Sequence, residues 1–588
     1  MAPSVQAGKG AYVRIFNLSD QKLQLETDLS GFKDEGSKKS ELKGQINPKA
    51  LFPAGGPVYI EESNVLWDSD MRLKFTSAFG NPNIQITYGL KRPYYESEQN
   101  NNGGLFVYSG ITQNNTAIDK GSSQAVINIF VSEHNVNREN WMSEIRDDAK
   151  LSQLFIPGSH DAATGELLIS VPHLATQSIG YTNQLRSGVR YFDLRLAIGA
   201  MTIISDSYPP EMHHGIFPLR HDFKEPVNDT IKFLRKNPSE TVIFQLKWDF
   251  GECLPNLQKV LKDNSNWFYT GTDIPTLGEV RGKIVIVSRI DNIGINFWSG
   301  WPGGNTYFTA QDEFERDSGK SESVDDFEKR KIKLVREYFA NTCKFDPGTP
   351  AIGADQKFNL NFLSATFGAK FPLEVATGFS GRGDSLNVIY AKGLNSLSSL
   401  PGYHAVMLMD GVVKEDGLAQ TALQLNFHTY GRPGFKPKAG KTYFFRPLIA
   451  PGKVLNVDVG KKDDATIHSQ HPDNDTWRWQ HFTLEGVTGQ ANTFRIFTSG
   501  KNGQKLYLDA FKGTESQDVK GISGGDQNNQ VWKILQEAGS RYYRIQSAVD
   551  GKYLDVFAGK TKDGSSVSRY PGGGTLAHQL WLLEETTP

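Results

Sequence analysis

The chain has few cysteines, no long apolar run and almost no net charge. Its 588 residues include only Cys253 and Cys343. A scaffold held by disulfides is therefore excluded, and we expect both thiols to be buried and unpaired. No stretch approaches the roughly 20 apolar residues of a membrane-spanning helix. The first nine residues hold no apolar core of signal-peptide length. We expect a soluble protein that is cytoplasmic or exported by a non-classical route.

The charge balance and the composition narrow the choice further. The chain has 64 Lys and Arg against 65 Asp and Glu, a formal net charge of -1, so no overall field draws it to nucleic acid. Its 58 glycines and 27 prolines favour short strands joined by turns. The length is too great for one hydrophobic core, so we expect several domains and no nucleic-acid partner.

Residues 1–135 consist of short segments that alternate apolar and polar side chains. Residues 12–16, 73–76, 84–88 and 126–130 show this period of two, and turn residues separate them. The pattern predicts an antiparallel β-sandwich without a catalytic motif. The segment loosely resembles small β-sandwich lysins that bind membranes. Its role is therefore either membrane or partner binding, or purely structural.

Residues 139–430 have a different rhythm, in which apolar strands alternate with helices. Residues 241–246 and 283–287 are apolar runs of strand length, whereas Val227, Ile231 and Leu234 share one helical face and residues 323–341 repeat the helical period. Alternation over so long a segment predicts a TIM-like (β/α) barrel. Residues 431–438 then form a plausible linker.

The last segment repeats itself. A Gln-x-aromatic triplet occurs at 480–482, 530–532 and 579–581, and each copy follows a similar strand at 453–456, 505–509 or 552–555. Three copies at a period of about 50 residues predict one unit used three times around a common core. The pattern resembles the ricin-type β-trefoil lectin, which implies a trefoil over 441–588. The chain is thus expected to be multidomain, α/β plus all-β.

Four polar islands follow strand-like runs in the middle segment. Barrel residues at the carboxyl ends of strands meet at one mouth, so these islands are expected to converge there. The candidate side chains are His160 and Asp161 in the first island, Asp193 and Arg195 in the second, His213 and His214 in the third, and Asp410 in the fourth.

This set suits phosphodiester cleavage. The reaction needs a base for the attacking hydroxyl and an acid for the leaving oxygen, and histidine titrates near neutrality. It also needs positive charge on the phosphate oxygens, which a guanidinium supplies through two hydrogen bonds. A carboxylate behind one histidine fixes its tautomer. Each of these residues taken alone is more often structural, so their order along the chain carries the hypothesis.

The islands resemble those of phosphatidylinositol-specific phospholipase C, in its bacterial, metal-independent branch. The segments 156–161, 190–195, 213–215 and 237–241 match the family's motifs in order. The resemblance implies that His160 is the general base, oriented by Asp410, and that His214 is the general acid, assisted by Asp161. It implies that Arg195 neutralises the phosphate beside Asp193. The implied inositol-binding residues are Lys247, Arg289, Asp312 and Phe314.

The same resemblance implies the reaction and the absence of a cofactor. Cleavage of phosphatidylinositol, or of a glycosyl-phosphatidylinositol, would release diacylglycerol and a cyclic inositol phosphate at a membrane surface. Calcium-dependent relatives hold a carboxylate where this chain has Arg195, because calcium requires several oxygen ligands. The guanidinium takes the place of the metal, so we expect no cofactor.

Several questions stay open at this stage. Phe314 stands where bacterial relatives have a tyrosine, and the connection between residues 200 and 213 is longer than theirs. The segment with Trp298 and Trp301 either inserts into a bilayer or packs at the barrel rim. In the trefoil, the ricin-like pattern implies a sugar site in the third lobe, formed by Asp555, Tyr570, His578 and Gln579. The rival functions are a phosphodiesterase for another headgroup and a non-catalytic membrane- or glycan-binding protein.

Overall fold

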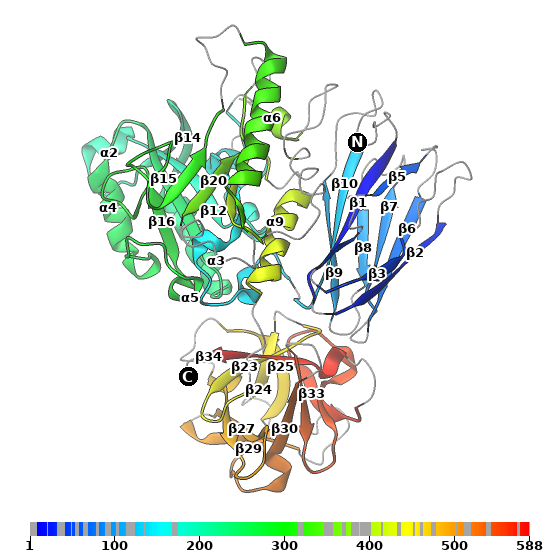
Figure 1. Ribbon diagram of the computed structural model, residues 1–588. Helices are drawn as coiled ribbons and strands as arrows, with labels where there is room; N and C mark the ends of the chain where they lie inside the picture. Colours follow the sequence, from blue (N-terminus) through cyan, green and yellow to red (C-terminus); the bar gives the residue numbers. More distant parts are fainter. Residues whose placement is uncertain are drawn as a thin grey trace.

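The computed structural model contains three β-rich regions that follow one another along the chain (Figure 1). It describes residues 9–586 apart from 20, 32–41, 49, 53–57, 63–68, 78–80, 89–95, 101–104, 113–123, 135, 167–173, 315–321, 346–356, 367–371, 378–386, 388–401, 413–415, 432–436, 451–452, 459–462, 472–477, 501–502, 511–518, 537–541 and 573–576. Most of the expected linker at 431–438 lies outside the described residues. Within them, no helix is long and apolar enough to cross a membrane.

The first region is built from two five-stranded sheets, drawn in blue in Figure 1. Alternate residues of their strands point into a shared apolar core, as the period of two requires. One sheet consists of β1 (Lys9–Asn17), β4 (Ala50–Phe52), β5 (Val58–Glu62), β9 (Phe106–Thr112) and β10 (Gln124–Ser132). The other consists of β2 (Leu23–Gly31), β3 (Gly44–Ile46), β6 (Ser69–Thr76), β7 (Asn83–Tyr88) and β8 (Glu96–Asn100).

The pairing in this region departs from the expected antiparallel pattern at one place. β1 and β10 are parallel neighbours, with Val13 opposite Ile127 and Ile15 opposite Ile129. The other ladders of the two sheets are antiparallel. The expectation of a wholly antiparallel arrangement was wrong here, because alternation fixes which side chains face the core but not which strand lies beside which.

The central region is a barrel of parallel strands with a gap. Its ladder runs β17-β16-β15-β12-β11-β22-β20-β18, and no pairing joins β17 to β18 among the described residues. The strands are β11 (Phe155–Ser159), β12 (Tyr191–Ala197), β15 (Val242–Phe250), β16 (Ile284–Ser288), β17 (Ile295–Asn296), β18 (Phe308–Gln311), β20 (Phe358–Phe362) and β22 (Ala405–Met409). An antiparallel hairpin of β13 (Glu211–His214) and β14 (Phe217–Asp222) extends from β12. A short pair, β19 (Lys344–Phe345) and β21 (Gly402–Tyr403), lies apart.

Helices of this region connect the strands. They are α1 (Tyr181–Arg186), α2 (Ala200–Ile204), α3 (Lys224–Lys236), α4 (Leu254–Asp263), α5 (Leu277–Val280), α6 (Val324–Asn341), α7 (Pro372–Thr377) and α9 (Asp416–Thr429). In α3, Val227, Ile231 and Leu234 are buried, as their spacing predicts. The side chain of Ser323 accepts a hydrogen bond from the amide of Asp326 and caps α6. Both cysteines are buried and free, as expected.

Helix α9 joins the first two regions. Residues 418–427 are all buried, so this described part of the helix has no solvent face. One side lies against β9 and β10, where the amide of Asn128 donates to the hydroxyl of Thr421 at 3.2 Å. The other side lies against β11, where the side chain of Asn426 bonds both the N–H and the carbonyl of Phe155. The first sheet therefore completes the outer layer of the barrel.

The third region is a twelve-stranded sheet with its own core. Its strands are β23 (Thr442–Pro447), β24 (Lys453–Asp458), β25 (Asp464–Ser469), β26 (Phe482–Gly486), β27 (Thr493–Ser499), β28 (Lys505–Asp509), β29 (Lys520–Ile522), β30 (Val531–Gln536), β31 (Tyr543–Ser547), β32 (Tyr553–Val556), β33 (Ser565–Tyr570) and β34 (Trp581–Thr586). Phe482, Trp532 and Trp581, the aromatic residues of the three repeats, are fully buried in this core. The repeat thus supplies one core aromatic side chain per unit.

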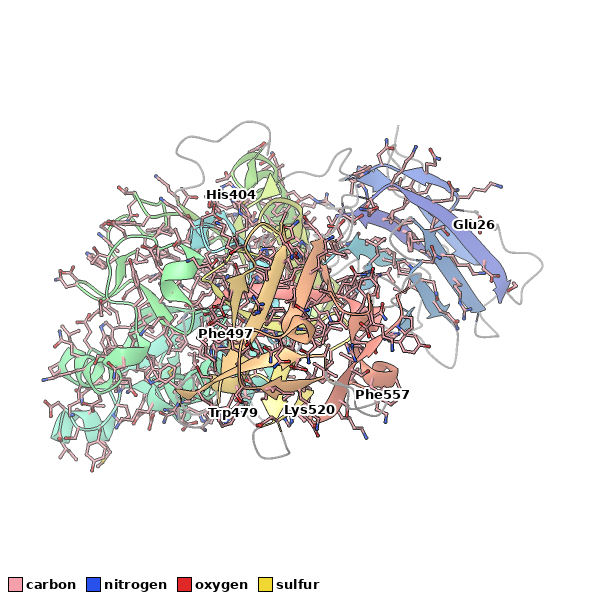
Figure 2. All side chains as sticks on the ribbon, turned by 90° about the horizontal axis from the view of Figure 1, so that it is seen from below. Glu26, His404, Trp479, Phe497, Lys520 and Phe557 are labelled. Carbon is pink, nitrogen blue, oxygen red and sulfur yellow. The ribbon has the colours of Figure 1, made fainter. Side chains whose placement is uncertain are left out.

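The third region lies at the amino-terminal end of the barrel strands. Gly431 pairs with Ile145, which precedes β11, and Leu448 and Leu582 join the apolar cluster that the barrel shares with the first region. In Figure 1 it lies below α5 and the end of α9, while α2 and β14 are at the far side of the barrel. In the view from below, its labelled Trp479, Phe497 and Lys520 overlie the barrel (Figure 2). The carboxyl ends of the barrel strands therefore face away from it.

Candidate active site

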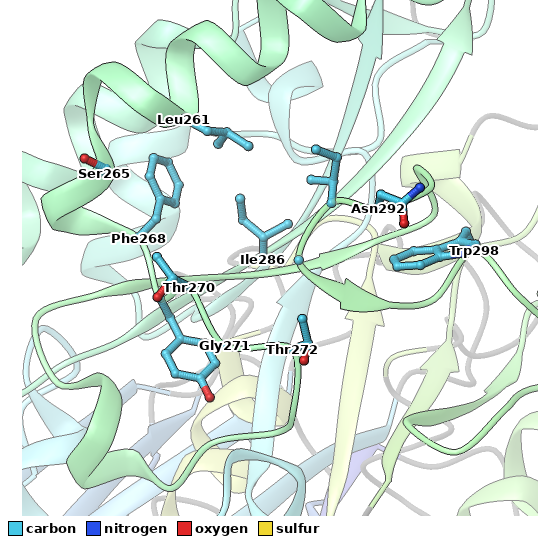
Figure 3. Close-up of a pocket in the computed structure, with 12 residues that line it drawn as sticks. Leu261, Ser265, Phe268, Thr270, Gly271, Thr272, Ile286, Asn292 and Trp298 are labelled. Carbon is cyan, nitrogen blue, oxygen red and sulfur yellow. The ribbon is translucent and has the colours of Figure 1, made fainter.

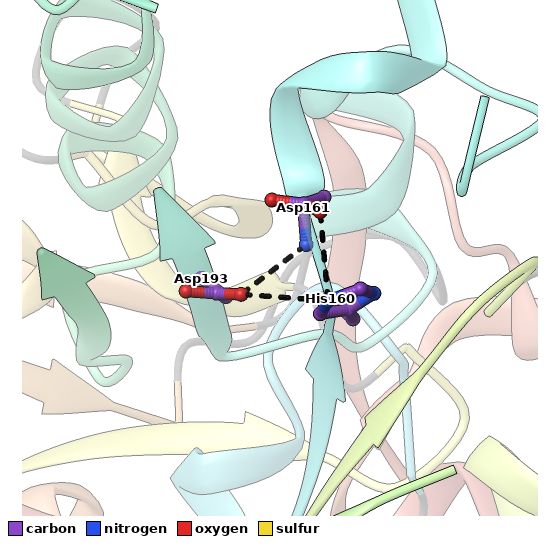
Figure 4. Close-up of side chains that lie close together, drawn as sticks. All are labelled: His160, Asp161 and Asp193. Carbon is purple, nitrogen blue, oxygen red and sulfur yellow. Dashed lines mark hydrogen bonds and ion pairs between the residues drawn. The ribbon is translucent and has the colours of Figure 1, made fainter. Parts of the chain in front are cut away.

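The side chains of the four islands meet at the carboxyl end of the barrel. His160 follows β11 directly, Asp193 and Arg195 share one face of β12, His214 ends β13 and Asp410 follows β22. Figure 4 shows His160, Asp161 and Asp193 close together. The two-residue period of a strand explains why Asp193 and Arg195 point the same way.

His160 is held between a carboxylate and a guanidinium. Its Nδ1 lies 2.7 Å from Asp410 Oδ1, and its Nε2 lies 3.0 Å from the Nη2 of Arg195. Because arginine only donates, Nε2 is the accepting nitrogen in the neutral form of the ring, and Nδ1 then carries the proton. Burial lowers the pKa of His160, but the carboxylates of Asp161 and Asp410 outweigh it and raise the pKa to about 9. The arrangement presents a basic nitrogen to the mouth.

Arg195 is bound by carboxylates on several sides. Its Nε lies 2.7 Å from Asp161 Oδ1, and its Nη2 donates to Asp193 Oδ2 at 2.9 Å. Burial opposes the charged form, yet Asp161 and Asp193 raise the pKa of Arg195 above its usual value. Burial also opposes the charge of Asp193, but Arg195 and His160 hold the pKa of Asp193 well below its usual range. The guanidinium is therefore a fixed positive charge.

Asp161 links the two histidines. Its backbone has a φ of 42°, in the left-handed region that Asp tolerates better than most residues. This turn brings its Oδ2 to 3.3 Å from Nε2 of His214 and 3.5 Å from Nε2 of His160. Nδ1 of His214 lies 2.9 Å from the carbonyl of Leu174. A protonated His214 can donate from both ring nitrogens, with the Nε2 proton on the mouth side. His213 points elsewhere, since its ring is buried beside Phe250.

The residues expected to bind inositol line the same mouth. Arg289 lies over the ring of Trp301 at 4.0 Å, and burial lowers its pKa. Burial raises the pKa of Asp312. Lys247 pairs with Asp249 at 2.7 Å, and the ring of Phe314 is partly exposed. Lys247 lies on β15, Arg289 follows β16, and Asp312 and Phe314 follow β18.

Trp298 and Trp301 have different surroundings. Trp301 stacks on Phe308 with ring centroids 5.3 Å apart, so it packs within the barrel. Trp298 lines a pocket of about 420 Å³ on the barrel flank, together with Leu261, Phe268 and Ile286 (Figure 3). This pocket contains none of the predicted site residues, so it is separate from the mouth.

The sequence analysis missed three polar residues of the site. Asp249 binds Lys247, lies 3.7 Å from Arg195 and accepts the N–H of Gly215 beside His214 at 2.7 Å. Gln245 donates to Asp193 at 2.9 Å, and Gln177 donates to the carbonyls of His160 and Met409. The face rule for strands was sufficient to find Asp249, two residues after Lys247. Nothing in the sequence singles out the two glutamines.

The donor set also bears on metal binding. His160, Asp161 and Asp193 bring ligand atoms within 4.8 Å of one another, close enough for a cation. The guanidinium of Arg195 already bonds both carboxylates. A divalent ion would have to displace this charge, so the residues present fit a metal poorly.

The third repeat of the trefoil holds the residues expected to bind sugar. Oδ2 of Asp555 lies 2.6 Å from Nδ1 of His578 and 3.0 Å from Nε2 of Gln579, while Tyr570 is exposed nearby on β33. The second repeat is built alike, since Asn529 and Gln530 both donate to Asp509. The carboxylates of Asp509 and Asp555 are buried and hydrogen-bonded, so each is held in a fixed orientation.

Comparison with known families defines the class of protein. Residues 148–290 match the model of the phosphatidylinositol-specific phospholipase C X domain, and residues 528–588 match that of ricin-type β-trefoil lectin domains. The resemblance drawn from the motifs is thereby confirmed, and the central domain is that of a phospholipase C-like phosphoric diester hydrolase or lyase.

Individual proteins are similar to this chain. A 1-phosphatidylinositol phosphodiesterase of Staphylococcus aureus is 28% identical over 250 residues, which are 39% of this chain and 76% of that protein. The enzyme of the same name from Listeria monocytogenes is 31% identical over 172 residues, 26% of this chain and 50% of that protein. The solved phosphatidylinositol-specific phospholipase C of Listeria monocytogenes is 25% identical, with a TM-score of 0.38. The match covers 49% of this chain and 99% of that protein.

Proposed function

We propose that the chain cleaves phosphatidylinositol or glycosyl-phosphatidylinositol without a metal, giving diacylglycerol and a cyclic inositol phosphate. One observation carries the proposal: His160, Arg195 and His214 all converge on the carboxylate of Asp161. A base, a fixed cation and an acid are thus held close together around one carboxylate, as the transfer of protons to and from a phosphodiester requires. We further propose the three-domain division 1–135, 139–430 and 441–588.

The proposed reaction assigns a role to each group. Nε2 of His160 takes the proton of the inositol 2-hydroxyl, whose oxygen bonds to phosphorus. The bond from phosphorus to the glycerol oxygen breaks, and His214 gives that oxygen a proton. Arg195 binds the phosphate oxygens while their charge is redistributed, and Asp410 stabilises the imidazolium of His160.

A membrane lipid is favoured as substrate by the apolar rim of the mouth. Ile203 and Ile204 of α2 are 73% and 72% exposed, and Ile216 and Phe217 next to His214 are also exposed. The side chain of Asn256 donates to the carbonyls of Ser205 and Tyr208 and so fixes the loop that follows α2. A fixed loop that keeps two isoleucines in water suits contact with lipid, as do the exposed Ile216 and Phe217 beside the proposed acid.

We also propose that the trefoil binds glycans through its third repeat. The support is the fixed Asp555, held by His578 and Gln579 beside the exposed ring of Tyr570. Such a platform offers a stacking face and a carboxylate acceptor to a sugar ring. Loss of binding to a glycan array in Asp555→Ala, with the central reaction unchanged, tests this part alone.

The catalytic proposal is tested by release of cyclic inositol phosphate from phosphatidylinositol vesicles in EDTA. We expect the wild type to be active, and His160→Ala and His214→Ala each to lose about a hundredfold or more of the rate. His213→Ala is the matched control, because this neighbouring ring points away from the site. Folded wild-type protein without activity on either lipid would favour another headgroup or a binding protein.

A further inference from the structure

Lys331 is a fully buried lysine close to the active site. It lies on α6 and has no exposed surface, whereas Lys333 two residues later has a side chain that is 72% exposed. Burying an ammonium is costly unless its protons are all bonded, so a lysine in this position requires an explanation. The proposed reaction uses neither Lys331 nor any other residue of α6.

The ammonium bonds the ends of two neighbouring strands. Its Nζ donates to the carbonyl of Phe362 at 2.8 Å, to the carbonyl of Glu313, and to Oε1 of Gln311 at 3.3 Å. Gln311 ends β18, and Phe362 ends β20. Three protons meet three acceptors, so Lys331 ties the carboxyl ends of β18 and β20 together.

The ends of β18 and β20 lie beside the residues proposed to bind the headgroup. Asp312 stands between two of the acceptors, and the carbonyl of Phe314 accepts the N–H of Thr366 after β20. The ring of Phe362 meets the ring of His160 edge-on, with centroids 5.8 Å apart. The same ring meets Trp301, over which Arg289 lies.

We propose that Lys331 is a positioning residue that fixes Asp312 and Phe314 for headgroup binding by joining the ends of β18 and β20. This deepens the proposed function and rests on it for the identity of the headgroup. Without the ammonium, three acceptors lose their donor, and the segment from Gln311 to Phe314 is free to shift away from His160.

We expect the hydrogen bonds by which Lys331 joins the ends of β18 and β20 to depend on pH. Burial lowers the pKa of Lys331 to about 7, although Asp312, Asp410 and Glu313 favour its charged form and Arg330 opposes it. The neutral amine has two protons for three acceptors. Headgroup binding should therefore weaken as the pH rises above about 7.

The test compares Lys331→Met with the control Lys333→Met on dihexanoyl phosphatidylinositol, below the concentration at which it forms micelles. We expect KM to rise about tenfold in Lys331→Met, the equivalent of one lost hydrogen bond of ordinary strength, with a smaller change in kcat. The wild-type KM should rise above pH 7, and that of Lys331→Met should not. Equal KM values and equal pH profiles in both variants would overturn the proposal.

Hydrogen exchange provides a readout that needs no substrate. Amides of residues 308–314 and 358–364 should exchange faster in Lys331→Met than in Lys333→Met, while those of β12 stay unchanged. In the wild type alone, the same amides should exchange faster at pH 8.5 than at pH 6 after correction for the intrinsic rate. An inactive wild type would refute the proposed lipid reaction. Unchanged amide exchange in Lys331→Met would refute the positioning role of Lys331, so the two failures are distinguishable.

Discussion

At the scale of single residues, the site depends on carboxylates that serve more than one partner. Asp161 contacts Arg195 and both histidines, and Asp193 takes hydrogen bonds from Arg195 and Gln245. Shared carboxylates hold the ionised groups at set distances before a phosphate arrives, which reduces the reorganisation needed in the transition state. Changing one of them should alter the pKa of its neighbours as well as the rate.

Asp410→Asn should shift the pH profile of the reaction. The Asp410 carboxylate helps to raise the pKa of His160 to about 9, so its loss lowers that pKa. A base is active when deprotonated, and the acid limb of kcat/KM should therefore move to lower pH. The plateau rate should fall by about tenfold or more, because the asparagine no longer stabilises the imidazolium.

Asp312→Asn is the comparison for this measurement, since that carboxylate does not bond His160. It should change KM and move the acid limb less than Asp410→Asn does, because the Asp312 charge acts on His160 only at a distance. An acid limb that stays fixed in Asp410→Asn would show that this carboxylate does not set the pKa of the base.

At the scale of elements, the proposed membrane contact of α2 can be tested apart from the strands behind it. The double change Ile203→Asp and Ile204→Asp should weaken turnover of vesicles about a hundredfold, because two large side chains each lose roughly 1.5–3 kcal/mol of burial in lipid. Turnover of monomeric dihexanoyl phosphatidylinositol should be unchanged. Val549→Asp, an exposed apolar residue of the trefoil, is the matched control. Equal losses on both substrates would mean that α2 supports the site and not the membrane contact.

The positions of residues within strands and helices also explain which parts of the site and the fold could be predicted from the sequence. His160 and Asp410 follow barrel strands and Arg195 lies near the end of one, and parallel strands bring such ends together. His214 ends the antiparallel strand β13, and only the family motif singled it out. Lys331 escaped notice because a lysine on an amphipathic helix is usually in water, and only the packing of α6 on β18 and β20 turns it inward. The parallel pairing of β1 with β10 joins residues more than a hundred positions apart, and no local pattern specifies such a partner.

At the scale of the whole molecule, we predict that helix α9, which packs on both of the first two regions, makes them one cooperative unit. A chain without residues 1–132 would expose the side of α9 that now meets β9 and β10. We expect its Tm to fall by about 10 °C or more, since several side chains each lose roughly 1.5–3 kcal/mol of burial. A chain without 441–588 keeps α9 enclosed and should lose less. If the chain without residues 1–132 has the same Tm as the whole chain, the barrel folds independently of the first region.

The placement of the trefoil restricts what its proposed sugar site can reach. A flat bilayer lying against the carboxyl ends of the barrel strands would leave the trefoil on the opposite side, one barrel length above the lipid. If the substrate is a glycosyl-phosphatidylinositol, its own glycan would lie too near the bilayer to reach Asp555 of the same molecule. A glycan bound by the trefoil would instead belong to a tall surface glycoprotein or to a facing membrane. The chain would then bind a glycan at one end and cleave a lipid at the other, with the barrel as the spacer between them.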